Sequence, residues 1–240
     1  MKDGLVAGAV VAMSALSQAA EFDVIAHRGA SGYLPEHTLE AASLAHAQGP
    51  AFIEQDIVLT KDGIPVVLHD IHLETVTNVE SVFPGRARED KRYYAIDFTL
   101  DELKQLSVHE RANADGTQVF PNRYQGTASF NIATLEEHIE LISQLNRITG
   151  KDIGFYPEVK SPAWHRSEGK DISVIVLETL RKYGLDDAHA NIYVQCFDHD
   201  ELKRIRNDLG AKRKLTQSSS ETDGGETTTA KSEWRISTGG

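Results

Sequence analysis

Apolar runs separated by amphipathic stretches recur along the first and last parts of the chain. Runs with few polar positions predict strands buried on both faces, and such strands in alternation with helices indicate a parallel sheet. The strands are expected at residues 22–26, 51–59, 64–68, 153–156 and 191–196. The helices are expected at residues 39–48, 100–106, 134–148, 171–183 and 198–209.

Two parts of the chain break this alternation. Residues 71–152 are polar and poor in strand patterns, which indicates an insertion after the third strand, and long loops inside compact domains are usually functional. Within it, Thr134 and Glu137 have the spacing of a capping box and predict a helix start. From Thr216 onward the sequence is polar and of low complexity, so residues 216–240 are expected to form a disordered tail.

About five strands with helices between them predict an α/β fold with a parallel sheet, and the family resemblance given below implies the TIM (β/α)8-barrel type. A complete barrel has eight strands and about 250 residues, so we expect residues 21–215 to form a partial barrel. An open parallel sheet leaves an unpaired edge and an uncovered core. We therefore expect the isolated chain to be poorly stable and weakly active or inactive.

The N-terminus has the character of an export signal. Lys2 is followed by an apolar run at residues 5–16, which is too short to span a membrane, and then by the small residues of Ser17-Gln18-Ala19. We interpret residues 1–20 as a signal peptide cleaved after Ala19 or Ala20. A periplasmic or secreted protein without stable membrane insertion after cleavage follows, and a buried N-terminal helix is the alternative.

Composition narrows the range of partners. Apolar residues make up 40% of the chain and the formal net charge is -11, which disfavours nucleic acid and anionic membrane surfaces. A small anionic substrate stays compatible with this charge because a bound divalent cation can reverse the local field. Cys196 is the single cysteine, so no intrachain disulfide forms. We interpret it as a small buried apolar residue, with a nucleophile as the alternative; the oligomeric state is left open.

Three carboxylates have the spacing of a metal site. Glu54 and Asp56 lie two residues apart in an expected strand, so their side chains share one face. Two carboxylates on a buried strand face repel each other, and a divalent cation resolves the repulsion; hard oxygen ligands suit Ca²⁺ or Mg²⁺. Glu158 stands at the end of a later strand and could complete the set. The alternative is an exposed edge strand with solvated acids.

Basic residues gather at the same strand ends. His27 and His69 each follow a strand and suit a general acid and a general base near neutral pH, although a single histidine at such a place is more often structural. Arg28 can make a bidentate contact to phosphate, Lys160 can neutralise a phosphate oxygen, and Glu36 is a further candidate contact. Together these residues favour metal-assisted phosphoryl transfer.

Five short segments, in this order, resemble the signature of the glycerophosphodiester phosphodiesterase family. Residues 92–99 and 193–197 are similar to its periplasmic bacterial branch, and the resemblance covers roughly residues 21 to 215. The family barrel has further strands that the tail does not match, which suggests a chain truncated at its C-terminus. The segments are Ile25-Ala26-His27-Arg28-Gly29, Leu34-Pro35-Glu36-His37-Thr38, Glu54-Gln55-Asp56, Val67-Leu68-His69-Asp70 and Tyr156-Pro157-Glu158-Val159-Lys160.

The resemblance implies a TIM barrel that hydrolyses small glycerophosphodiesters, such as glycerophosphocholine, to glycerol 3-phosphate and an alcohol. It implies Ca²⁺ as the cofactor, as in the periplasmic branch, with Mg²⁺ as the alternative. By the same resemblance His27 is the base and His69 the acid. The metal ligands implied are Glu54, Asp56 and Glu158, and the phosphate-side residues are Arg28 and Lys160.

Three alternatives compete with this interpretation. The first is a truncated, inactive relative of the enzyme. The second is a secreted binding or surface protein that keeps the barrel, which the intact set of acids and histidines disfavours. The third is a phospholipase D-like phosphodiesterase on the same barrel, which would need an apolar entry surface that the polar insertion does not suggest.

Overall fold

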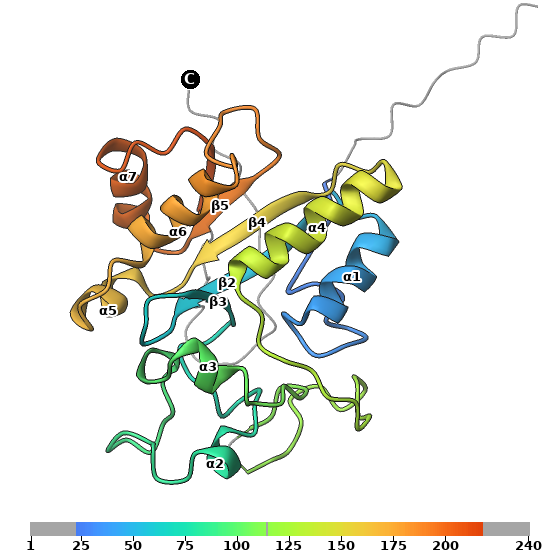
Figure 1. The fold of residues 1–240 in the computed structure, drawn as a ribbon, viewed down its shortest axis with the longest axis vertical. Coiled ribbons are helices and arrows are strands. Elements are labelled where there is room, and N and C mark those ends of the chain that lie inside the picture. The colour runs from blue at the N-terminus through green and yellow to red at the C-terminus, as the bar shows by residue number, and fades with distance from the viewer. Residues whose placement is uncertain (1–22, 114, 218–240) are drawn as a thin grey trace, which may run out of the picture.

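The computed structural model describes residues 23–113 and 115–217, and these form one open, mainly parallel sheet with helices against it (Figure 1). The strand order is β1-β2-β4-β5-β6, with β3 paired to β2. Within the described residues the sheet does not close, which confirms the expected unclosed TIM-barrel type of fold. The strands are β1 (Ile25–Ala26), β2 (Phe52–Leu59), β3 (Pro65–Val67), β4 (Gly154–Val159), β5 (Tyr193–Cys196) and β6 (Lys214–Gln217).

The central strand β2 is buried along its whole length. It pairs in parallel with β1, where Ala26 lies opposite Ile53, and with β4, where Asp56 lies opposite Glu158. Ile53 and Ile57 belong to the main hydrophobic core under the helices. Glu54 and Asp56, one residue away along the pleat, therefore face the opposite side of the sheet.

The third strand differs from the expectation, because it is antiparallel to β2 rather than part of the parallel series. Residues 60–64 form a tight turn, in which Gly63 has a φ of 80°, and the chain then runs back along β2. Val67 lies opposite Ile57, and the Leu68 N–H donates to the Asp56 carbonyl at 2.9 Å. This return delivers the next residues to the level of Asp56.

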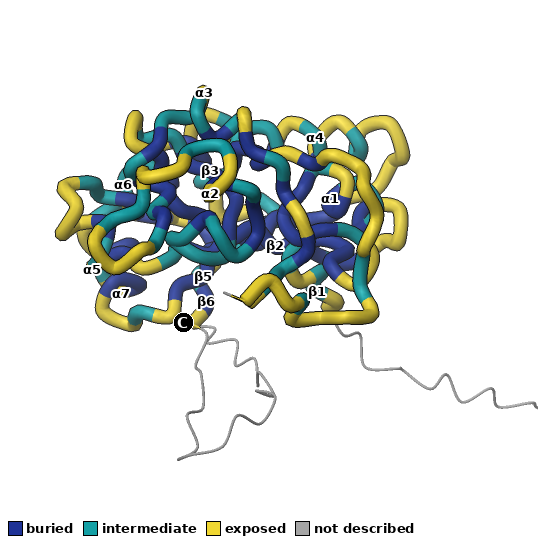
Figure 2. The backbone as a smooth tube through the Cα atoms, turned by 90° about the horizontal axis from the view of Figure 1, so that it is seen from below, coloured by how far each residue is buried: buried dark blue, intermediate teal, exposed yellow. Residues whose placement is uncertain are grey.

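Helices pack on the apolar side of the sheet in two groups (Figure 1). Helices α1 and α4 contact each other, and α5, α6 and α7 lie toward β4 and β5. Thr134 caps α4 through the predicted capping box. The helices are α1 (Leu39–Gln48), α4 (Leu135–Thr149), α5 (Pro162–Ser167), α6 (Ile172–Lys182) and α7 (His199–Asn207). In Figure 2 the buried strands lie inside a shell of more exposed backbone.

A second hydrophobic cluster joins the insertion to strands β2 and β3, and its inserted members include Leu73, Phe98 and Leu106. Its short elements are α2 (Val79–Val82), the 3-10 helix η1 (Ala95–Asp97) and α3 (Leu100–Leu103). Helix α4, which the sequence had placed inside the insertion, instead contributes Leu135, Ile139 and Ile142 to the main core. The inserted part is therefore shorter than residues 71–152 and ends before α4.

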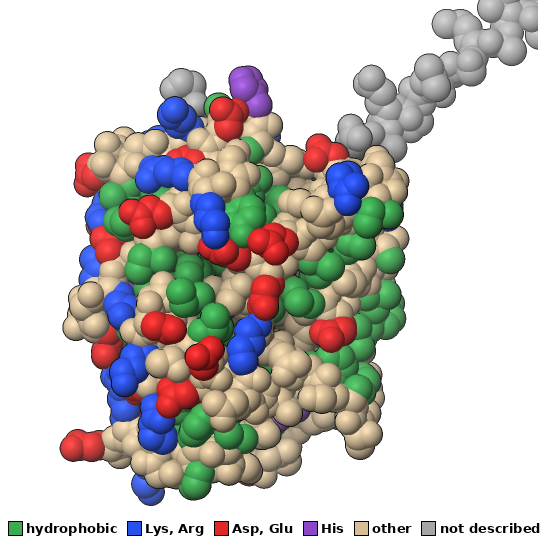
Figure 3. Space-filling model, viewed as in Figure 1, with side chains coloured by type: hydrophobic (Ala, Val, Ile, Leu, Met, Phe, Trp, Pro, Cys, Tyr) green, Lys and Arg blue, Asp and Glu red, His purple; other side chains and the backbone are tan. Residues whose placement is uncertain are grey.

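The last described segment corrects the expected start of the tail. Strand β6 pairs in parallel with β5 from Tyr193↔Lys214 to Cys196↔Gln217, so Thr216 and Gln217 belong to the sheet. The expected signal peptide at residues 1–20 and the rest of the expected tail lie outside the described residues. No helix among the described residues is long and apolar enough to cross a membrane. The face in Figure 3 intersperses acidic and basic side chains.

Gly29 lets the turn after β1 approach helix α1. Its φ is 77°, and a Cβ there would lie 3.0 Å from the Ala41 carbonyl carbon. We expect Gly29→Ala to lower the free energy of unfolding by on the order of 1–3 kcal/mol, because a left-handed backbone and a close contact both oppose the methyl group. Chemical denaturation measures this change. Gly32→Ala is the matched control, since a Cβ at Gly32 meets nothing within 4 Å; equal losses in both variants would contradict the prediction.

Candidate active site

Three predicted acids meet on the polar face of the sheet. Glu54, Asp56 and Glu158 each offer a carboxylate oxygen, and these oxygens lie within 4.8 Å of one another. The three residues are 2%, 1% and 4% exposed. The alternative of solvated acids on an exposed edge is therefore wrong for this strand. The pleat of β2 supplies two of the acids, and the register between β2 and β4 brings the third opposite Asp56.

The three buried acids repel one another. Burial raises the pKa of Glu54 well above its ordinary value, and the charges of Asp56 and Glu158 raise it further. Burial and the Asp56 charge also raise the pKa of Glu158, to about 8. Among the described residues, the buried Asp56 Oδ1 has no hydrogen-bond donor. A hard divalent cation fits this set, because it would supply the positive charge and ligate that free oxygen.

Asp56 is the acid that stays ionised. Burial alone would raise its pKa, but the hydrogen bond and charge of His37, together with the charge of Lys160, hold the pKa below its ordinary range. His37 Nε2 donates to Asp56 Oδ2 at 2.8 Å. The His37 carbonyl in turn accepts from Nε2 of the buried His138 at 3.0 Å. His37 lies in a segment quoted for the family resemblance but was given no role, and His138 was not singled out, because neither follows a strand.

Two cationic side chains border the acids as expected. Arg28 has a φ of 60°, and this turn aims its backbone N–H at Glu54 Oε2, 3.0 Å away. The Arg28 Nε lies 3.6 Å from Asp56 Oδ2. Lys160 Nζ lies 2.7 Å from Glu158 Oε1 and 3.7 Å from Asp56 Oδ1. Both cationic side chains therefore lie beside the three acids.

The two predicted histidines follow different strands that both pair with β2. His27 follows β1, with Nε2 at 3.5 Å from Glu54 Oε2 and a side chain that is 63% exposed. His69 follows β3, and its Nδ1 is 2.7 Å from Asp70 Oδ1. An ionised carboxylate can only accept, so Nδ1 carries the hydrogen. Burial lowers the pKa of His69, and the bond to Asp70 partly offsets this.

Comparison with known proteins decides the family. The family model for the glycerophosphoryl diester phosphodiesterase family matches residues 27–236. This chain belongs to that family. The match includes every residue singled out above and extends into the segment that the sequence had suggested as a tail.

Relatives of this phosphodiesterase family member agree with the assignment. A glycerophosphodiester phosphodiesterase of Haemophilus influenzae is 49% identical over 212 residues, covering 85% of this chain and 58% of the relative. One of Treponema pallidum is 40% identical, covering 87% of this chain and 60% of the relative. The chain thus spans less than two thirds of these relatives. The structure of an Oleispira antarctica phosphodiesterase with the product sn-glycerol-3-phosphate has a TM-score of 0.58 at 27% identity, covering 84% of this chain and 68% of that one.

Glu36, which the sequence suggested as a further substrate contact, is a buried partner of Arg28 and Arg111. It is 4% exposed, and its Oε2 accepts from Arg28 Nη1 at 3.0 Å. Burial would raise its pKa, but Arg111 and Arg28 lower the pKa to about 2. A carboxylate so engaged would repel a phosphate, so its contacts favour holding Arg28 over touching substrate. Gln195, which the sequence analysis gave no role, holds Glu158 by a hydrogen bond: its Nε2 donates to Glu158 Oε2 at 3.0 Å.

The carboxylate cluster predicts how a cation changes stability. We expect Ca²⁺ to raise the melting temperature. At a free Ca²⁺ concentration of roughly 100 times the dissociation constant, the folded state gains about 2.7 kcal/mol. Glu54→Gln should remove this response, yet stabilise the metal-free protein, because a buried glutamate there must either keep a charge beside Asp56 or take up a proton, and glutamine does neither. Differential scanning calorimetry with and without Ca²⁺ measures both effects. Glu40→Gln, on the exposed surface of α1, should keep the full Ca²⁺ response; a response retained in Glu54→Gln would contradict the site.

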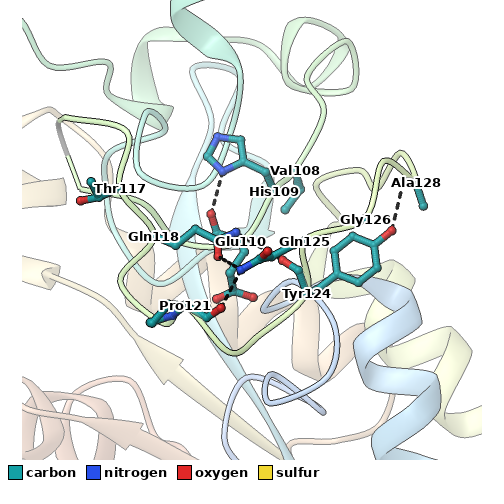
Figure 4. A pocket seen from close by; sticks show the side chains of 10 residues that line it. All are labelled: Val108, His109, Glu110, Thr117, Gln118, Pro121, Tyr124, Gln125, Gly126 and Ala128. Atoms are coloured by element: carbon teal, nitrogen blue, oxygen red, sulfur yellow. Dashed lines mark hydrogen bonds between the residues drawn. The ribbon is translucent and has the colours of Figure 1, made fainter.

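A pocket of about 590 Å³ lies in the insertion, apart from the three acids, and is lined by residues between Val108 and Ala128 (Figure 4). Its wall includes Glu110, which is 3% exposed and has no hydrogen-bond donor to either side-chain oxygen among the described residues. The nearest cationic atom is Arg123 Nη1, 3.7 Å from Glu110 Oε1. Burial raises the pKa of Glu110 although Arg123 opposes the rise. The ionised carboxylate is therefore a destabilising feature of the insertion.

This raised pKa fixes the sign of a pH effect. A carboxyl that binds its proton more tightly in the folded protein is harmless below the unfolded pKa and destabilises as the pH rises through the folded pKa. We expect Glu110→Gln to raise the free energy of unfolding by about 1 kcal/mol or more at pH 7 and by much less at pH 4. Urea denaturation at both values measures it, with the exposed Glu89→Gln as control. A gain in the free energy of unfolding that is equal at pH 4 and pH 7, or no gain at either pH, would contradict the prediction.

Proposed function

We propose that this chain hydrolyses glycerophosphodiesters to glycerol 3-phosphate and an alcohol with the help of a divalent cation. The observation that carries the proposal is the buried group of Glu54, Asp56 and Glu158, bordered by two histidines and two cationic side chains. The names of the relatives support this reaction, and so does the glycerol phosphate product bound by the Oleispira antarctica phosphodiesterase.

The three acids would hold the cation. All their ligand atoms are carboxylate oxygens, which Ca²⁺ and Mg²⁺ both accept. We propose Ca²⁺ and keep Mg²⁺ as the alternative, following the resemblance to the periplasmic branch. When bound, the cation supplies positive charge that polarises a phosphoryl oxygen.

The chain's own residues would divide the remaining work. Arg28 and Lys160 bind phosphate oxygens and counter the charge that grows on them in the transition state. His27, with its exposed ring, removes a proton from the attacking oxygen, which belongs to water or to the neighbouring glycerol hydroxyl. His69, held through Nδ1 by Asp70, protonates the leaving alcohol from Nε2.

The direct test is release of glycerol 3-phosphate from glycerophosphocholine by the purified chain. We expect weak release with Ca²⁺, as the open sheet suggests, loss of release after chelation, and loss in Glu54→Gln, because the cation site and its charge are then missing. Glu40→Gln is the control and should keep the activity. A coupled enzymatic assay for glycerol 3-phosphate measures the rate.

Failure has a clear form in this test. A soluble, monodisperse chain that binds Ca²⁺ but releases no glycerol 3-phosphate would overturn the proposed activity for this chain. The family assignment would stand, and an inactive relative would be the remaining interpretation. Release that is unaffected by chelation would instead overturn the role of the cation.

A further inference from the structure

One arginine from the insertion joins the two halves of the candidate site. Arg111 Nη2 donates to Glu36 Oε1 at 2.6 Å, and its Nε donates to Glu36 Oε2 at 3.2 Å. Its Nη1 donates to Asp70 Oδ2 at 2.5 Å. The side chain is 13% exposed. A single guanidinium therefore uses all three of its nitrogens on two carboxylates that come from different parts of the barrel.

Each of these carboxylates has a second partner in the site. Glu36 accepts from Arg28 Nη1 at 3.0 Å, on the side where phosphate is expected. Asp70 accepts from His69 Nδ1 at 2.7 Å, on the side of the expected acid. The contacts thus run in one chain, Arg28 to Glu36 to Arg111 to Asp70 to His69. No other described side chain contacts both Glu36 and Asp70.

The charges make this arrangement dependent on Arg111. Without it, Asp70 would keep the short bond to His69 and a longer one, 3.3 Å, from the Thr75 hydroxyl. Glu36 would keep Arg28 alone. A half-buried carboxylate that loses a charged donor moves toward water or toward another cation. Both His69 and Arg28 would then lose the group that fixes their orientation.

We propose that Arg111 is a positioning residue that sets the relative geometry of the phosphate-binding Arg28 and the proton-donating His69. It touches no substrate in this proposal and acts through Glu36 and Asp70. The inference rests on the proposed function, since it deepens the description of the same site. The insertion would then contribute to catalysis by orienting Arg28 and His69, whether or not it also contacts substrate.

The test compares Arg111→Gln with Arg111→Lys and Asp70→Asn. In Arg111→Gln, the loss of hydrogen bonds to charged groups should lower kcat about tenfold to a hundredfold, because Asp70 no longer orients His69. KM should rise, because Glu36 no longer orients Arg28. Arg111→Lys keeps the charge without the planar fork, so it should recover part of kcat. The double variant Arg111→Gln/Asp70→Asn should have a kcat close to that of the less active single variant, because both substitutions remove the same contact between Arg111 and Asp70.

Arg86→Gln is the matched control. It removes an arginine of the insertion that pairs with Glu102 and has no contact with the site. It should leave kcat and KM close to those of the parent chain. Circular dichroism and melting temperature verify that each variant folds.

The outcomes separate the inference from the proposed function. Unchanged kinetics in Arg111→Gln, or independent multiplicative losses in the double variant, would overturn the positioning role while the activity stands. Failure of the parent chain to release glycerol 3-phosphate would overturn the proposed function. In that case Ca²⁺ binding and the His69 Nδ1 proton signal in NMR still test the arrangement. A His69 signal shifted by Arg111→Gln and unchanged by Arg86→Gln supports it, and an unmoved signal overturns it.

Discussion

The arrangement of the site depends on three buried carboxylates that would repel one another if left alone. Glu54, Asp56 and Glu158 are fixed by the pleat and register of two neighbouring strands, so they cannot move apart. The surrounding side chains compensate in part, through His37, Arg28 and Lys160. The compensation is uneven, since Asp56 has a lowered pKa and its two neighbours have raised ones. Such an imbalance is what a cation with oxygen ligands would remove.

His69 reaches this cluster by a path that a regular barrel does not use. In a regular barrel, residues after a parallel strand gather at one end of the sheet. Here β3 turns back along β2, and the bond from Leu68 N–H to the Asp56 carbonyl sets how far it returns. His69 thereby comes within reach of the Asp56 charge, by a path that the strand pattern did not contain.

The sequence is informative where one element alone sets the geometry. Period-two spacing was enough to put Glu54 and Asp56 on one face, and the capping box located the start of α4. Strand direction is not encoded in a short apolar run, so the antiparallel β3 was missed. Strand β6 was missed because Lys214, Thr216 and Gln217 are polar, and its hydrogen bonds to β5 hold it in the sheet. Arg111 lies 41 residues from Asp70 and 75 from Glu36, so no local pattern could pair them.

These contacts imply that the insertion and the barrel are not independent units. The apolar cluster of the insertion is shared with residues of strands β2 and β3. Arg111 also supplies charge to Glu36 and Asp70, which the barrel segments carry. Buried carboxylates that lose their cation are costly, so the barrel segments would be destabilised without the insertion. Glu110 is in the opposite situation. Its neighbour Arg111 pairs with carboxylates of the site, whereas Glu110 has only a distant cationic partner in Arg123. The backbone at residues 110–111 thus directs Arg111 into the site, and the buried Glu110 beside it destabilises the insertion.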